Sequence, residues 1–322
     1  MKVCPSAFLA AALAILLAQP GQAQDYPSKP VRLVVPYSAG GGTDFVARTV
    51  AERLTASLGQ PIVVDNRAGA NGATGSDIVA KAAPDGYTLL IGAAGTLVVA
   101  PHLGPLPFDP AKDLVPITNL GTSAFIVAVN PDVPVKTLAD LIALAKSQPG
   151  KLNYGSSGTG GSPHLATELF QSMAGVQMVH VPYKGLSLAI TDLLGDHIQV
   201  LFMDVGLAVP FVKDGKVLAL AITGSKRSAV LPNVPTVAEA GVPGYDARTW
   251  YGLLAPAGTP RPIVDRLAAE ANKALDSPGM RAKLATQGLE AAGGTPEQFA
   301  SFIRSESAKW AQVIKNANIK IQ

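Results

Sequence analysis

Two segments rich in glycine, serine and threonine carry the residue types that bind anions. The first contains Tyr37, Ser38, Ala39, Gly40, Gly41, Gly42, Thr43 and Asp44, and the second contains Ser156, Ser157, Gly158, Thr159, Ser162 and His164. Glycine lets a bound group approach the main chain and permits the positive φ values that turn successive N–H groups the same way. Each segment is therefore a candidate anion-binding turn.

Each turn lies between a predicted strand and a predicted helix. Residues 31–35 precede the first turn as an apolar strand, and apolar side chains recur every four residues in the helix expected over 45–58. Residues 152–154 precede the second turn, whose helix we expect to have Ser162 as its N-cap and Gly175 just after its end. The leading N–H groups of a helix have no partner within it and carry partial positive charge, so both turns are placed to bind an anion.

The composition of the turns favours a carboxylate over a polyphosphate. Neither turn contains Arg or Lys, and a polyphosphate site usually includes a cation. Each hydrogen bond to a charged group contributes roughly 1.5–3 kcal/mol. Four to six such bonds would offset the cost of association and still give the roughly 8 kcal/mol of a micromolar complex.

The turns do not match the common nucleotide or hydrolase motifs. Phe45 and Pro163 stand where G-x-G-x-x-G requires its last glycine, and Thr159 stands where the nucleophile elbow G-x-S-x-G requires its last one. A tight strand-to-helix connection without a ligand remains the alternative for either turn taken alone.

Apolar strand-like runs and amphipathic helix-like runs alternate along most of the chain, which predicts an α/β fold with mostly parallel sheets flanked by helices. We expect a first lobe over 24–121, a second lobe over 122–249, and a return to the first lobe over 250–322. The helices expected over 263–275, 280–287 and 296–315 have no strands of their own, so they should pack on the first lobe. Ligands bind beyond the carboxyl ends of such strands, so the two turns should face one cleft between the lobes.

Four side chains, two of them in the turns, are candidates for a more specific role in that cleft, each with a structural alternative. Asp44 either caps its helix or pairs with a ligand ammonium group. His164 either donates to the ligand or serves the core, and Lys184 either meets a distal carboxylate or is solvated or paired with an Asp. Asp204, at the end of a predicted apolar strand, either accepts from a ligand amino group or bonds a nearby N–H.

Charge and cysteine content exclude several classes of function. The 322 residues include 26 Lys plus Arg and 23 Asp plus Glu, a net charge of +3, and no basic run is longer than Lys226-Arg227. This pattern excludes a nucleic-acid partner. The single cysteine, Cys4, lies near the N-terminus, and the histidines have no metal-binding spacing, so we expect no metal and no cofactor.

The N-terminal pattern predicts a secretory signal peptide covering residues 1–23. Lys2 supplies a positive charge, an uncharged apolar stretch runs from 8 to 18, and Gly21-Gln22-Ala23 offers small residues for cleavage after Ala23. The apolar stretch is shorter than the ~20 residues that cross a bilayer. We therefore expect an exported, periplasmic protein.

Seven motifs in order along the chain resemble those of the Bug receptors, the extracytoplasmic solute-binding proteins of the tripartite tricarboxylate transporter family. They are 34–44, Asn66-Arg67-Ala68-Gly69-Ala70-Asn71-Gly72, 80–89, 154–164, Val181-Pro182-Tyr183-Lys184-Gly185, 231–241 and 250–259. The resemblance implies a two-lobed, flytrap-like type II periplasmic binding fold that closes on a small carboxylate held by the two turns and bridging water. It also implies membrane permease subunits as partners, and we expect the receptor to be a monomer and not an enzyme.

The sequence departs from that family at Leu186-Ser187-Leu188, where Gly-Ala-Pro or a similar run is more usual. This loop borders the expected cleft, so the departure bears on which carboxylate binds. Two other functions compete with transport. One is an exported serine hydrolase that uses Ser157 or Ser162 with His164, although residues two apart on a helix do not face each other. The other is a carboxylate receptor that acts in signalling.

Overall fold

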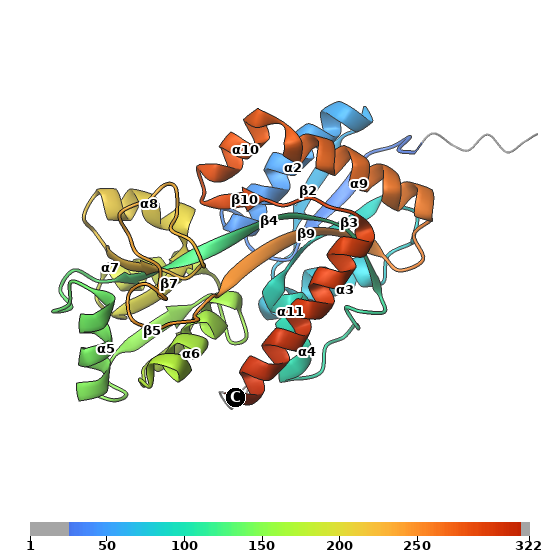
Figure 1. Cartoon of the computed structure of the whole chain (residues 1–322). Coiled ribbons are helices and arrows are strands. Elements are labelled where there is room, and N and C mark those ends of the chain that lie inside the picture. The colour runs from blue at the N-terminus through green and yellow to red at the C-terminus, as the bar shows by residue number, and fades with distance from the viewer. Residues whose placement is uncertain (1–25, 317–322) are drawn as a thin grey trace, which may run out of the picture.

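The computed structural model describes residues 26–316 and has two lobes joined by strands that cross between them (Figure 1). The first lobe contains β1 (Val31–Val35), α2 (Gly42–Leu58), β2 (Ile62–Asn66), η1 (Ala70–Gly72), α3 (Ala73–Ala80), β3 (Thr88–Ala93), η2 (Gly95–Val99), α4 (Ala100–Leu103), β9 (Arg248–Pro256), α9 (Arg261–Asp276), α10 (Pro278–Ala285), β10 (Leu289–Ala291) and α11 (Pro296–Asn316). The second lobe contains α5 (Leu138–Ser147), β5 (Asn153–Ser156), α6 (Ser162–Ala174), β6 (Val179–Pro182), α7 (Leu186–Leu194), β7 (Val200–Asp204), α8 (Val205–Lys213) and β8 (Leu218–Ile222).

A single long strand, β4 (Leu114–Val129), belongs to both lobes. Its first part, up to Ala124, pairs with β9 and β10, and its second part, from Phe125, pairs with β7 and β8. The strand order is β2-β1-β3-β9-β4-β7-β5-β6, with β8 and β10 also paired to β4. The two sheets are therefore continuous through β4.

The sheets are mixed, although the strands that lead into the turns run parallel to neighbours as expected. β1 is parallel to β2 and β3, and β5 is parallel to β6 and β7. The crossing strands β4 and β9 are antiparallel to each other, to β3, and to β7 and β8. The expectation of mostly parallel sheets therefore fails at the crossing strands, which return the chain from one lobe to the other.

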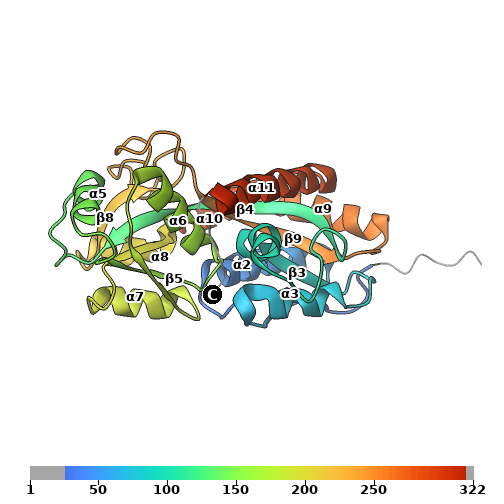
Figure 2. The same cartoon turned by 90° about the horizontal axis from the view of Figure 1, so that it is seen from below.

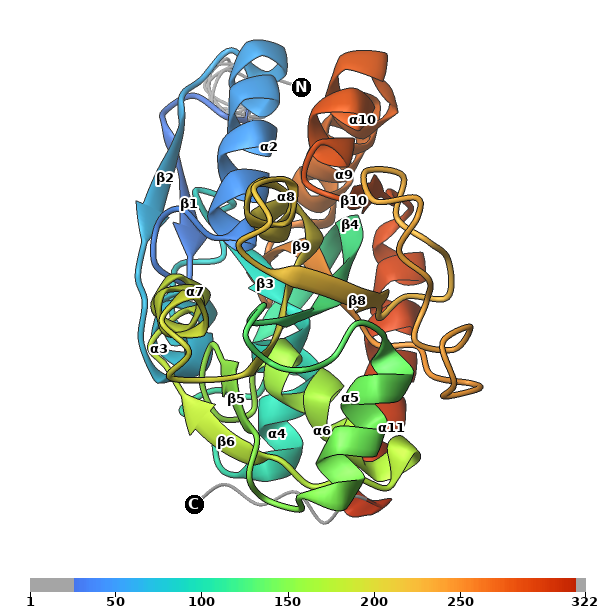
Figure 3. The same cartoon turned by 90° about the vertical axis from the view of Figure 1, so that its left-hand side faces the viewer.

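Helices cover both faces of each sheet. In the first lobe α2 and α9 pack on one face through residues such as Val50 and Leu267, while α3, α4 and α11 cover the other (Figures 1 and 2). In the second lobe α7 and α8 cover one face, and α5 and α6 the other (Figure 3). The C-terminal helices pack on the first lobe as expected, but the short strand β10 between them was not expected.

Local signals in the sequence account for several helix ends and fail at others. α5 begins with a capping box in which the Thr137 side chain accepts from the Asp140 N–H. The N-cap of α6 is Gly161 and not Ser162, which is the first helical residue and makes no cap hydrogen bond. Gly175 follows the end of α6 in the left-handed conformation, as expected.

The predicted signal peptide, residues 1–23, lies outside the described residues. In the part of the chain from 26 to 316, no helix has both the length and the apolar character needed to cross a membrane.

Candidate functional site

The first turn is fixed from within by Asp44. The Asp44 carboxylate accepts hydrogen bonds from the Gly40 N–H at 3.0 Å, Arg48 Nε at 2.9 Å and Asn66 Nδ2 at 3.0 Å. Burial opposes ionisation of Asp44, but these hydrogen bonds hold its pKa below the usual value. Asp44 thus shapes the turn as an ion and is not the N-cap, which is Gly41. The leading N–H groups at Gly42 and Thr43 lie at the start of α2, where they have no partner within the helix.

The second turn is supported from beneath by Ser156 and His164. The buried Ser156 hydroxyl contacts His180 Nε2 at 2.6 Å and accepts from the Gly158 N–H at 3.1 Å. His164 Nδ1 accepts from the Gly160 N–H at 3.2 Å. Both were candidate ligand contacts, but the structure places them inside the lobe because their polar atoms complete the turn. Ser157, Thr159 and Ser162 remain partly exposed.

Two stacked imidazoles lie under this turn. The ring centroids of His164 and His180 are 4.1 Å apart, and Tyr154 stacks on His180 at 5.0 Å. Burial, with His180 as a second cause, lowers the pKa of His164 to about 3, and burial lowers that of His180 to about 4. Both rings are therefore neutral at pH 7, which leaves Nδ1 of His164 free to accept a hydrogen bond.

A hydrogen-bonded chain in the first lobe runs from the first turn toward the second. Tyr37, at the start of the first turn, donates to Thr96 Oγ1 at 2.7 Å, and Thr96 donates to the Asn71 carbonyl at 2.7 Å. Gly72 makes this packing possible, because a Cβ there would lie 2.4 Å from Thr96 Oγ1 and its φ is +89°. The chain ends at Asn71, which lies against the second turn.

The Asn71 side chain is a site residue that the sequence did not single out. A Cβ placed on Gly161 would lie 3.5 Å from Asn71 Oδ1, and one on Gly160 would lie 3.9 Å from its Nδ2. Both amide atoms are buried without a hydrogen-bond partner among residues 26–316. The main-chain φ of +49° at Asn71, inside Gly69-Ala70-Asn71-Gly72, is the unusual feature. Its glycine-rich flanks are the one signal in the sequence that could have pointed to this residue.

Further contacts join the lobes beside the turns. Gly95, at the start of η2, faces the second turn, since a Cβ there would lie 3.4 Å from Ser162 N. Thr249 of β9 contacts the Ser162 hydroxyl at 3.5 Å. The Tyr251 hydroxyl donates to Asp204 Oδ1 at 3.4 Å, linking β9 to the end of β7. A Cβ on Gly42, the first residue of α2, would lie 3.7 Å from Asp204 Cγ, so α2 and α6 both begin at the interlobe boundary.

Asp204 and Lys184 differ in their surroundings. Burial raises the pKa of Asp204 to about 6, against the opposing effect of the Tyr251 hydrogen bond. Lys184 is exposed between β6 and α7, and within the described residues no ion pair or hydrogen bond involves its side chain. Asp204 is thus brought to the boundary with the turns, while Lys184 is left in solvent.

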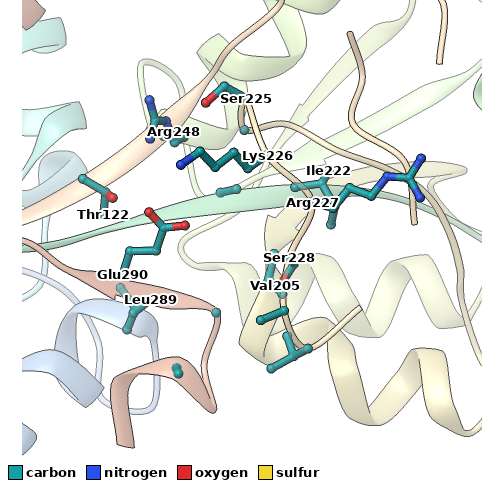
Figure 4. A pocket seen from close by; sticks show the side chains of 16 residues that line it. Thr122, Val205, Ile222, Ser225, Lys226, Arg227, Ser228, Arg248, Leu289 and Glu290 are labelled. Atoms are coloured by element: carbon teal, nitrogen blue, oxygen red, sulfur yellow. The ribbon is translucent and has the colours of Figure 1, made fainter. Parts of the chain in front are cut away.

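Two hollows lie where the two lobes meet. One, of about 320 Å³, lies beside the first turn and is lined by Gly40–Gly42, Leu207 of α8 and Gln287. The other, of about 150 Å³, lies over Thr122, Ala124 and Arg248, with Lys226 and Glu290 pointing into it (Figure 4).

Strand pairing places the second hollow on the opposite face from the turns. Ala124 pairs with Arg248 and lies on the hollow side, whereas the neighbouring Thr249 contacts Ser162 of the second turn. Side chains alternate between the faces of a strand. The hollow shown in Figure 4 therefore lies on the other face of the crossing strands from the second turn, between Gly288–Glu290 of the first lobe and Gly224–Val230 of the second.

The site has little of what hydrolysis or metal chemistry requires. The close Ser–His pair is Ser156 with His180, and Ser156 is fully buried. Within residues 26–316 no carboxylate hydrogen-bonds to His164 or His180. In the same part of the chain no three His, Cys, Asp or Glu side chains lie close enough to hold a metal. The arrangement is suited to holding an anion by main-chain N–H groups and hydroxyls.

Comparison with known proteins agrees with this architecture. Residues 46–319 match the family model for the tripartite tricarboxylate transporter family receptor, TctC. The protein BugT of Bordetella pertussis is 38% identical over 308 residues, which cover 95% of this chain and 94% of BugT.

Two solved structures share the fold over at least 90% of this chain. R. palustris Rpa4515 with adipate has a TM-score of 0.88 and 38% identity, covering 92% of this chain and 99% of that one. MatC from Rhodopseudomonas palustris with bound malate has a TM-score of 0.84 and 34% identity, covering 90% and 100%. With matches over nearly the whole length of each protein, the chain belongs to the TctC, or Bug, family of solute-binding receptors of tripartite tricarboxylate transporters.

Proposed function

We propose that this protein is a periplasmic receptor that captures a small carboxylate between its lobes and presents it to a membrane permease. The observation that carries the proposal is that two helix starts lie against the opposite lobe: a Cβ on Gly42 would lie 3.7 Å from Asp204 Cγ, and a Cβ on Gly95 would lie 3.4 Å from Ser162 N. The relatives solved with adipate and malate, both dicarboxylates, support the same ligand class.

In this proposal main-chain N–H groups and hydroxyls of both turns hold the ligand. Ser38, Gly41, Gly42 and Thr43 act from the first lobe, and Ser157, Thr159 and Ser162 act from the second. Asn71 supplies an amide whose buried atoms lack partners within the described chain. Binding to one lobe first and then to the other would draw the lobes together, because only the closed form offers both sets of donors.

The test is calorimetry of the purified protein with succinate, adipate, malate and citrate, with succinamide as the uncharged counterpart of succinate. We expect at least one dicarboxylate to bind near micromolar affinity and to reduce the radius of gyration in X-ray scattering, and succinamide to do neither. No heat from any acid and an unchanged radius would contradict the proposal.

The competing functions are tested separately. Ester turnover that disappears in a Ser157→Ala variant would favour a hydrolase instead. Capture of a sensor kinase, and of no permease subunit, by the ligand-loaded protein would favour signalling.

A further inference from the structure

Asp204 is a carboxylate placed where the proposed ligand is also a carboxylate. It ends β7 in the second lobe, and its one side-chain hydrogen bond within the described chain comes from Tyr251 at 3.4 Å. A Cβ built on Gly42, the first residue of α2, would lie 3.7 Å from Asp204 Cγ. An anion held at the start of α2 would therefore lie beside a second negative charge.

The titratable groups around Asp204 do not offset its charge. From the first lobe, Tyr251 and Tyr37 have pKa values raised mainly by burial, and Asp44 and Arg48 of α2 pair with each other. Lys283 of α10, which lines the hollow beside the first turn, is paired with Glu52.

The titratable groups of the second lobe do not offset the charge of Asp204 either. β4 carries no titratable side chain and places Phe125 opposite Asp204. Tyr154 of β5 bonds Glu168 of α6, and Asp192 of α7 accepts from Tyr183. Of the other titratable groups on elements packed against β7, His164 is neutral and Lys213 lies in the last turn of α8. No cation among residues 26–316 forms an ion pair with Asp204.

Two carboxylates this close, with no cation between them, do not both remain ionised; they share a proton unless another donor intervenes. A ligand hydroxyl or ammonium group next to the bound carboxylate is such a donor. Malate carries a hydroxyl of this kind and succinate does not.

We propose that Asp204 is a specificity-determining residue, an acceptor that a donor on the ligand must satisfy, so that a dicarboxylate without one binds together with a proton. The inference rests on the proposed function of the interlobe cleft as a carboxylate site. It adds a preference for 2-hydroxy or 2-amino dicarboxylates at and above neutral pH.

The test compares succinate with malate between pH 7 and 8.5, where both are dianions. Titration calorimetry in two buffers of different ionisation enthalpy measures the protons taken up. We expect succinate to take up close to one proton and to lose about tenfold in affinity per pH unit. We expect malate to take up few protons and to change less than about threefold over the same range.

The matched variant is Asp204→Asn, which keeps the shape and carries a permanent donor. It should bind succinate with pH-independent affinity, and at pH 8.5 more tightly than the parent. The parent measurement needs no variant, so a folding defect in Asp204→Asn leaves the test decisive. Succinate binding without proton uptake would overturn the role of Asp204 alone, whereas no binding of any carboxylate at any pH would overturn the proposed function.

Discussion

His164 shows how a single buried side chain can complete a turn by accepting a main-chain hydrogen bond. Its Nδ1 accepts the Gly160 N–H, and burial keeps the ring neutral. The sequence placed His164 at the turn but could not predict whether its ring points into the lobe or toward the cleft. The orientation of the ring depends on His180, 16 residues further on, and on the Gly160 N–H, and the helical pattern specifies neither contact.

Replacing His164 by Phe should remove this acceptor while keeping a ring on His180. The Gly160 N–H then loses its partner, which should lower the free energy of unfolding by about 1–3 kcal/mol at pH 7.5. The measurement is urea unfolding, with His197→Phe as the same change at an exposed histidine.

The pH dependence gives a second readout of this variant. Because the folded pKa values of His164 and His180 are lowered to about 3 and about 4, the unfolded chain binds more protons below pH 6.5. This contribution to stability is complete above pH 6.5 and is lost as pH falls toward 4. In His164→Phe the slope should be shallower by up to about 1.4 kcal/mol per pH unit. An unchanged slope would mean that His164 is already charged in the folded protein.

At the scale of elements, the glycines at the start of α2 have unequal roles. A Cβ on Gly42 would lie 2.6 Å from the Tyr251 hydroxyl, whereas one on Gly41 would have only Ser38 O within reach, at 4.0 Å. Gly42→Ala should displace Tyr251 from Asp204 and weaken carboxylate binding by at least about tenfold. Gly41→Ala should change it less than about threefold. Calorimetry with the acid that binds most tightly measures the affinity of both variants. Equal losses of affinity would contradict the unequal roles of Gly41 and Gly42.

The strand and the helix that the sequence did not predict both lack the usual local signals. The first part of β4 contains Pro116 and Gly121, which normally interrupt strands, and the structure places pairing irregularities beside both. α8 contains Pro210 and is apolar on most sides, so it lacks the amphipathic period that indicates a helix. The turns themselves were predictable because strand end, glycine run and helix start are all local. Asn71 was not, because its neighbours Thr96, Gly160 and Gly161 are distant in sequence.

At the scale of the whole molecule, the lobes share more than a linker. β4 runs through both sheets, and one apolar core includes Leu90 of the first lobe and Phe202 of the second. We therefore expect a single cooperative transition in calorimetric unfolding. A carboxylate at 100 times its Kd should add about 2.7 kcal/mol of stability and raise the midpoint by roughly 5 °C. Two separate transitions, only one of them moved by ligand, would show that the lobes unfold independently.

The position of β9 also limits the order in which the strands can pair as the chain emerges, N-terminus first. β9 lies between β3 and β4, yet it is made more than a hundred residues after both of them begin. The second lobe is encoded by one uninterrupted stretch, so its pairing partners are all present by the time residue 222 has emerged. The first lobe must wait with a gap in its sheet until residue 256 is added. A chain that has emerged only as far as that point would expose two unpaired strand edges, and strand edges of this kind recruit other chains.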